Sequence, residues 1–129
     1  MTLGHVNILF GWIWMCFGFV AGMLMGLWAE KENWLGGYGS LTRRYLRLGH
    51  IAFIALAIIN ILYGRELDSV NISDNLKHVG SYLMLFGAAG IPLVCIFAAF
   101  WRKIKYVLPF PASALLIGTV ILVIGLVRM

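Results

Sequence analysis

The sequence predicts an all-α integral membrane protein, a single bundle of four transmembrane helices. Hydrophobic residues make up 62% of the 129 residues and charged residues only 12%, with a mean hydropathy of +0.93. A water-soluble domain of this size needs far more polar surface. Four apolar runs, at about residues 6–29, 45–64, 79–101 and 106–127, are each long enough to cross a bilayer as a helix. A β-barrel would instead alternate polar and apolar residues.

Basic residues are concentrated in two of the three connections between the spans. They are Lys31, Arg43, Arg44 and Arg47 before or at the start of the second span, and Arg102, Lys103 and Lys105 before the fourth. The positive-inside rule therefore places both termini and the 65–77 loop outside. The net charge of +5 reports this topology, because no basic face or motif for nucleic acid is present. We expect a bacterial inner membrane, with an organelle inner membrane as the alternative.

The first span, residues 6–29, contains a series of glycines at helical spacing. Gly18, Gly22 and Gly26 form two overlapping steps of four residues. Small residues at this spacing let another helix backbone approach closely. They predict a packing face for other membrane subunits or for a second copy of this chain, within the lipid bilayer.

The second span, residues 45–64, is preceded by a cap candidate, Ser40 or Thr42. Arg43, Arg47 and His50 follow i, i+4, i+7 spacing and share one helix face. This face predicts an inner cofactor site, and four ligands suit it: a second haem, haem propionates, a quinone carbonyl or a lipid headgroup.

The third and fourth spans carry the three prolines. Pro92 lies inside the third span, where it removes one helix hydrogen bond and frees the carbonyl of Ala88, which predicts a kink. Pro109 and Pro111 lie in the first turns of the fourth span, where missing amide donors matter least. The fourth span has no ionisable group in its interior, so we expect a scaffold or a lipid-facing wall.

The chain also reads as two similar halves. A His-Val pair begins at His5 and again at His78, and each pair lies 23 residues before a tryptophan, Trp28 or Trp101. A basic-Tyr pair follows each tryptophan. This order predicts two tandem helical hairpins related by a pseudo-twofold axis along the membrane normal. The alternative is that interface residues recur at membrane spacing without any duplication.

His5 and His78 are expected at the outer mouths of two parallel helices, where they are candidate axial ligands of a b-type haem iron. Gly11, Gly80 and Gly87 are expected to give the porphyrin clearance. The polar residues near the same depth are Asn7, Asn60, Tyr63, Ser81 and Tyr82. The alternative is that both imidazoles only contribute polarity at the membrane interface.

The sequence leaves three functional hypotheses. The first is a haem-carrying, cytochrome-like electron-transfer protein or subunit of a respiratory complex. The second is a cofactor-free accessory or scaffold subunit of a larger membrane complex, and the third is a small oligomeric channel or carrier. All five carboxylates lie in loops, which disfavours proton-coupled transport. The spans also lack the paired groups of a catalytic centre, so we expect no catalytic activity of the chain's own.

Overall fold

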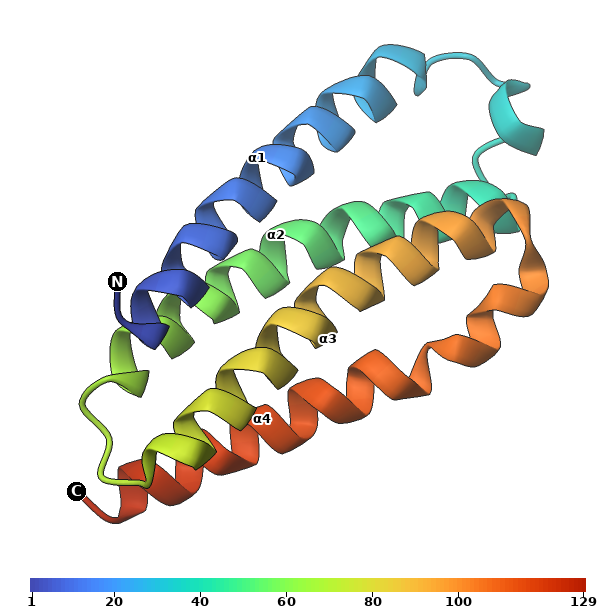
Figure 1. The fold of residues 1–129 in the computed structure, drawn as a ribbon. Coiled ribbons are helices and arrows are strands. Elements are labelled where there is room, and N and C mark those ends of the chain that lie inside the picture. The colour runs from blue at the N-terminus through green and yellow to red at the C-terminus, as the bar shows by residue number, and fades with distance from the viewer.

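The computed structural model describes residues 1–129 and consists of helices and their connections, without strands (Figure 1). The long helices are α1 (Leu3–Trp28), α2 (Leu41–Leu67), α3 (Asp74–Phe100) and α4 (Pro109–Val127), and two 3₁₀ segments, η1 (Trp34–Gly36) and η2 (Arg102–Val107), lie in the connections. Four spans are long and apolar enough to cross a membrane. The predicted fold class, an all-helical four-helix membrane bundle, is confirmed.

Helix ends differ from the predicted spans by a few residues, and capping accounts for two of the differences. The Thr2 hydroxyl accepts a hydrogen bond from the backbone N–H of His5 at 3.2 Å and so starts α1 at Leu3. The Ser40 hydroxyl accepts from the N–H of Arg43 at 3.2 Å, which makes Ser40 the cap of α2. Both polar caps lie outside the apolar runs, so hydropathy alone places the helix starts too late.

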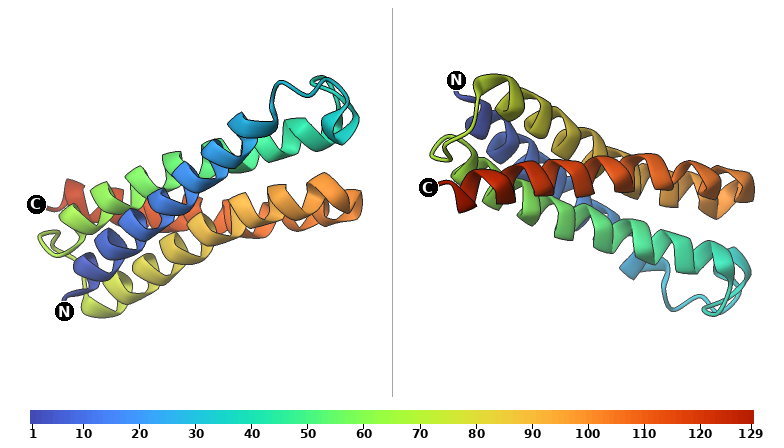
Figure 2. Two further views of the ribbon diagram at one scale, coloured as in Figure 1. Left: turned by 90° about the horizontal axis from the view of Figure 1, so that it is seen from above. Right: turned by 90° about the horizontal axis from the view of Figure 1, so that it is seen from below.

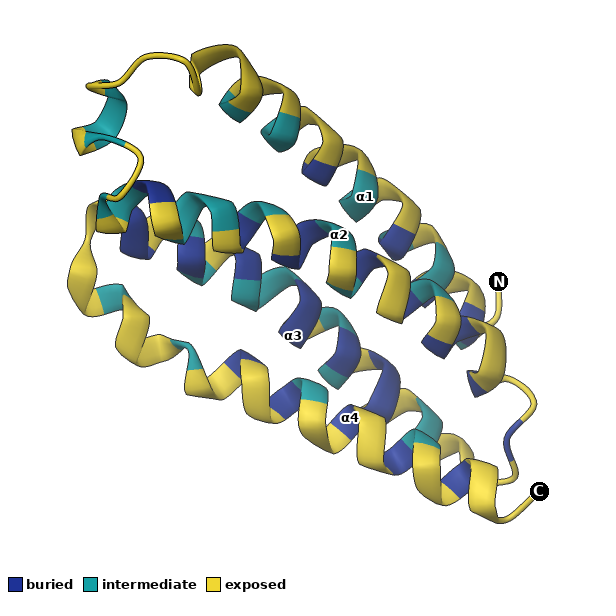
Figure 3. Ribbon diagram, turned by 180° about the vertical axis from the view of Figure 1, so that it is seen from behind, coloured by how far each residue is buried: buried dark blue, intermediate teal, exposed yellow.

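The helices pack in chain order, with α2 and α3 in the middle and α1 and α4 on the two sides (Figures 1 and 2). Both termini and the loop from α2 to α3 lie at one end, called here the terminal end. The 29–40 loop and the 101–108 segment lie at the other, called the basic end. Buried residues of α1 and α4 form narrow stripes that face α2 and α3 (Figure 3).

Glycines on α1 set its close approach to α2, but the stripe differs from the predicted one. A Cβ atom at Gly11 would lie 2.7 Å from the carbonyl oxygen of Ala57, and one at Gly18 would lie 2.7 Å from Cγ1 of Ile54. Nothing lies within 4 Å of such an atom at Gly26. The close contact therefore continues toward the N-terminus of α1 and ends before Gly26, because α1 and α2 diverge toward the basic end (Figures 1 and 3).

One contact in each helical hairpin lies at the offsets of the predicted repeat. Gly11 meets Ala57 between α1 and α2, and the positions 73 and 61 residues later, Met84 and Gly118, meet between α3 and α4. These are the offsets that relate the two His-Val pairs and the two basic-Tyr pairs. The agreement is not general, because Leu115 packs against Gly87 whereas its counterpart Ile54 packs against Gly18, whose own counterpart is Ile91. The pseudo-twofold relation therefore stays a prediction. An exact twofold would make the α2–α3 contact and the α4–α1 contact equal. Helix α2 packs along α3, but α4 and α1 make no comparable contact.

The helix α3 continues through Pro92, and the carbonyl of Ala88 that this proline frees has a partner on another helix. Trp14 on α1 donates its indole N–H to Ala88 O at 2.8 Å. An unpaired carbonyl in a membrane costs several kcal/mol, so this bond replaces the one that the proline removes. It also ties α1 to α3 near the middle of the bundle.

Candidate functional site

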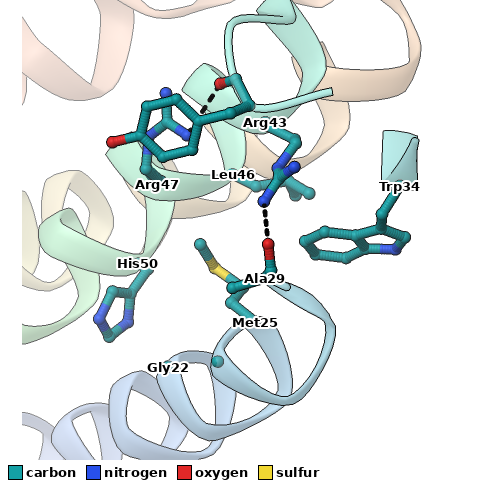
Figure 4. Close-up of a pocket in the computed structure, with 10 residues that line it drawn as sticks. Gly22, Met25, Ala29, Trp34, Arg43, Leu46, Arg47 and His50 are labelled. Carbon is teal, nitrogen blue, oxygen red and sulfur yellow. Dashed lines mark hydrogen bonds between the residues drawn. The ribbon is translucent and has the colours of Figure 1, made fainter. Parts of the chain in front are cut away.

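A cavity of about 260 Å³ lies at the basic end, between α1, the first turns of α2 and the loop that joins them (Figure 4). All three residues of the predicted inner site, Arg43, Arg47 and His50, line it. The other lining residues are Gly22, Met25, Gly26, Ala29, Trp34, Tyr38 and Leu46. The wall is thus largely apolar and aromatic with a few cationic or polar groups, which is the usual composition of a small-molecule site.

The divergence of α1 from α2 opens this cavity, and the 29–40 loop covers it. The last close contact between the helices is at Gly22, where an added Cβ atom would lie 2.6 Å from Cε1 of His50. The loop then turns sharply through Leu35, Gly36 and Gly37, all with positive φ angles of 51°, 84° and 93°. Glycine adopts such angles without the steric cost of a side chain. This turn brings Trp34 and Tyr38 to the cavity wall.

Arg43 is buried, with only 5% of its surface exposed. Its Nη2 donates to the carbonyl oxygen of Ala29 at 3.1 Å, at the C-terminus of α1, where the helix dipole favours a cation. Its guanidinium also lies 5.2 Å from the ring centre of Trp34 and 5.6 Å from that of Tyr38. The remaining N–H groups have no protein acceptor, and no carboxylate lines the cavity. The guanidinium charge is therefore held in place but not neutralised.

Arg47 adds a second guanidinium to the same wall. Its Nη1 donates to the carbonyl oxygen of Tyr38 at 3.2 Å, and its guanidinium lies 4.5 Å from the ring centre of Tyr38 (Figure 4). Tyr38 thus contacts both arginines through its ring. The loop and α2 stabilise each other here, and the two positive charges are held side by side at the membrane-interface end of the helix.

His50 lies deeper on the same face of α2. Its Nδ1 is 3.0 Å from the carbonyl oxygen of Gly18 on α1. The ring also packs against Gly22, where a side chain would collide with it. This contact fixes the imidazole orientation at the base of the cavity.

No protein-family model, curated protein or solved structure matches this chain.

The two outer histidines, His5 and His78, are both exposed at the terminal end, and neither lines a cavity. The glycines expected to clear a porphyrin are filled by protein: Gly11 meets α2, Gly80 meets the Tyr63 hydroxyl, and Gly87 meets α4. The expected clearance is therefore wrong for this packing. In this packing no space for a porphyrin lies beside these glycines, and ligation of a haem by the two exposed imidazoles stays a prediction.

Three of the five polar residues predicted near these histidines form a hydrogen-bonded cluster inside the bundle, whereas Tyr63 Oη has no partner and Tyr82 is exposed. Asn7 on α1 donates to Oδ1 of Asn60 on α2 at 2.9 Å, and Ser81 on α3 donates to Oδ1 of Asn7 at 2.5 Å. All three side chains are at most 1% exposed. Their groups satisfy one another across three helices, which points to a packing role rather than a ligand site.

A second, smaller cavity of about 180 Å³ lies between α2, α3 and α4 near the terminal end, with Tyr63, Met84 and Thr119 in its wall. No group of three or more histidine, cysteine or acidic side chains is placed to hold a metal ion. Among the two cavities, only the one at the basic end gathers cationic side chains.

The sequence identified the three α2 residues of the site but not the residues that enclose them. Trp34, Tyr38 and Ala29 lie outside the helical face whose spacing pointed to the site. The sequence did contain a signal for them. Trp34 and Tyr38 flank a glycine-rich segment that comes just before the arginine-rich start of α2. Which ring contacts which guanidinium depends on the loop conformation, which spacing does not encode.

Proposed function

We propose that this chain is a multi-pass membrane protein that binds the oxygen-rich polar head of a membrane amphiphile, a lipid or a quinone, in the basic-end cavity. The observation that carries the proposal is the Arg43 side chain, which is 5% exposed and has one backbone acceptor and no carboxylate in its cavity. Its remaining nitrogens are not fully buried, so they are accessible to a ligand, and a charged guanidinium forms strong hydrogen bonds to oxygen acceptors. An oxygen acceptor on a ligand head supplies the missing hydrogen bonds.

The size and position of the cavity favour a headgroup over a whole cofactor. Its volume of about 260 Å³ lies just below the roughly 300–1,000 Å³ of sites that enclose drug-sized ligands. Arginines with tryptophan and tyrosine at a helix end are typical of the bilayer interface, where polar heads lie. The tail of the amphiphile then remains in the bilayer.

The test is binding of phosphatidylglycerol and of a decyl-substituted benzoquinone, each measured by native mass spectrometry of the detergent-purified protein. Arg43→Gln is compared with Arg44→Gln, because Arg44 is the exposed neighbour that does not line the cavity. Losing a charge-assisted hydrogen bond, about 1.5–3 kcal/mol, weakens binding about 10- to 100-fold in Arg43→Gln. Equal effects of both variants would mean that surface charge alone attracts the ligands.

Electron transfer through haem is a second candidate function. It is favoured by the exposure of His5 and His78, whose imidazoles make no hydrogen bond within the chain. Two free imidazoles at one end of the molecule are available as axial ligands to a haem shared with another membrane subunit. In that form the chain serves as an electron-transfer or anchor subunit of a larger redox complex.

A further inference from the structure

The base of the basic-end cavity carries a hydrogen-bond acceptor. The carbonyl oxygen of Gly18 can only accept, so the 3.0 Å contact requires that Nδ1 of His50 carries the proton. In the neutral imidazole, Nε2 then has a free lone pair. Nε2 has no partner in the chain, and it is not fully buried, because Tyr63 Oη is the one fully buried side-chain polar atom without a partner. His50 is one of the residues that line the cavity.

Donors and acceptor are therefore ordered along the cavity. Arg43 and Arg47 supply donors near its mouth, and His50 supplies an acceptor seven residues beyond Arg43, about 10 Å deeper at 1.5 Å per residue. A ligand that satisfies both ends needs an oxygen acceptor toward the arginines and a donor toward His50. This order distinguishes between the two kinds of amphiphile.

A diacylglycerophospholipid such as phosphatidylglycerol does not meet this requirement. Its phosphate accepts from the arginines, but the groups deeper than the phosphate are ester oxygens, which accept only. Hydroxyls of a polyol headgroup lie on the aqueous side of the phosphate, away from His50. A bound phospholipid would leave the His50 Nε2 lone pair without a donor in a site that its acyl chains dehydrate, which costs binding free energy.

We propose that the cavity accepts the head of a quinol, with one hydroxyl donating to Nε2 of His50 and the other oxygen accepting from the guanidinium of Arg43. This inference rests on the proposed function and specifies its ligand. Arg43 and His50 are seven residues apart on one helix, a rise of about 10 Å at 1.5 Å per residue. The two oxygens of a para-quinol lie at opposite ends of one ring, and a hydrogen bond at each oxygen extends its reach to a span of this order.

The structure also provides a path for the tail. Gly26 lines the cavity, and nothing lies within 4 Å of a Cβ atom built on it. The gap at Gly26 lies on α1, most of whose surface is exposed along an apolar span. The α1 wall therefore leaves space beside Gly26 for an isoprenoid or alkyl tail.

The first test changes the ligand and leaves the protein intact. The wild-type protein in detergent is titrated under anaerobic conditions with a decyl-substituted benzoquinol and with its dimethyl ether, which lacks both hydroxyl donors. Leaving one acceptor unpaired weakens binding by about tenfold. We therefore expect the dimethyl ether to bind about tenfold more weakly or worse.

The second test uses His50→Phe, which removes the acceptor, and His78→Phe, which makes the same change at the exposed terminal end. We expect His50→Phe to bind quinol and dimethyl ether equally, and His78→Phe to keep the wild-type preference. His50 also bonds to Gly18, so His50→Phe needs a check that it still folds. The check is whether this variant retains the Arg43-dependent binding of phosphatidylglycerol or benzoquinone.

Failure of this inference and failure of the proposed function give different results. If quinol and ether bind the wild type equally, or if only phosphatidylglycerol binds in an Arg43-dependent manner, the quinol assignment is overturned and the amphiphile site stands. If no amphiphile binding depends on Arg43, both are overturned. A tenfold preference for quinol that persists in His50→Phe would assign the donor contact to another residue and contradict the role given to His50.

Discussion

The Asn7 side chain on α1 donates to Asn60 on α2 at 2.9 Å, and both side chains are fully buried. The amide of Asn60 also reaches the backbone carbonyls of Leu56 and Met84, at 3.2 and 3.4 Å. Asn60 on α2 thus contacts α1 through Asn7 and α3 through Met84 O. Asn7 also accepts a hydrogen bond from Ser81 on α3. The pair ties the outer helix α1 to the α2–α3 centre of the bundle.

Replacing Asn60 with alanine is expected to destabilise the protein by about 1–2 kcal/mol. The substitution leaves the Asn7 amide without its acceptor in a dehydrated interior, and hydrogen bonds between membrane helices contribute up to about that amount. Unfolding by sodium dodecyl sulfate, monitored by circular dichroism, measures the change. Asn75→Ala, at an exposed position in the first turn of α3, is the matched control. An equal loss in both variants would contradict a special role for the pair.

Gly11→Ala is expected to cost about 1–3 kcal/mol of stability, whereas Gly26→Ala is expected to be neutral or mildly stabilising. The new Cβ atom at Gly11 would meet the backbone oxygen of Ala57 at 2.7 Å, and backbone cannot move aside as a side chain can. At Gly26 the space is open, and alanine favours the helix. The same unfolding assay compares the two. Similar stabilities would mean that α1 does not approach α2 this closely.

These two positions also show what the sequence predicts and what it does not. The spacing of Gly18, Gly22 and Gly26 predicted a face for other subunits or a second copy, but Gly18 and Gly22 pack against α2 of the same chain and nothing lies near Gly26. The close contact with α2 also includes Gly4 and Gly11, which the spacing missed. Spacing identifies a helix face, whereas the point at which two helices diverge depends on the loop between them. Hydropathy predicted all four spans because each must cover the bilayer thickness. The caps that set the first residues are local and polar.

The functional residues show the same limit. Arg43, Arg47 and His50 lie on one helix face at fixed spacing, so sequence alone brought them together. The contact of Trp34 with Arg43 arises through a turn of three residues with positive φ, and the acceptor Ala29 lies at the end of another helix. Contacts between elements depend on tertiary packing, which periodicity does not report.

Trp14→Phe is expected to destabilise the protein by about 1 kcal/mol because Ala88 O loses its donor. In a Pro92→Ala background the same substitution is expected to cost less, since residue 92 then has an amide that donates to Ala88 O. A double-mutant cycle measures this coupling. Trp12→Phe, at an exposed site on the same helix, controls for the loss of indole area. Equal costs in both backgrounds would show that Trp14 acts through packing alone.

A haem bound by His5 and His78 is expected only when another subunit covers the terminal end. The glycines that would have admitted a porphyrin between α1 and α3 are occupied by protein atoms, so the isolated chain offers the two imidazoles on its surface without a pocket. The chain purified alone should show no Soret band that shifts on reduction with dithionite. Gently solubilised native membranes that contain the chain and its partners should show such a band. The band should decrease in the double variant His5→Ala/His78→Ala but not in the control Lys77→Ala, which lies near the same end.

A Soret band that persists in the double variant would remove these histidines as ligands. A band in the isolated chain that disappears in the double variant would mean that α1 and α3 separate to admit the porphyrin, at the expense of the Asn7–Ser81 hydrogen bond.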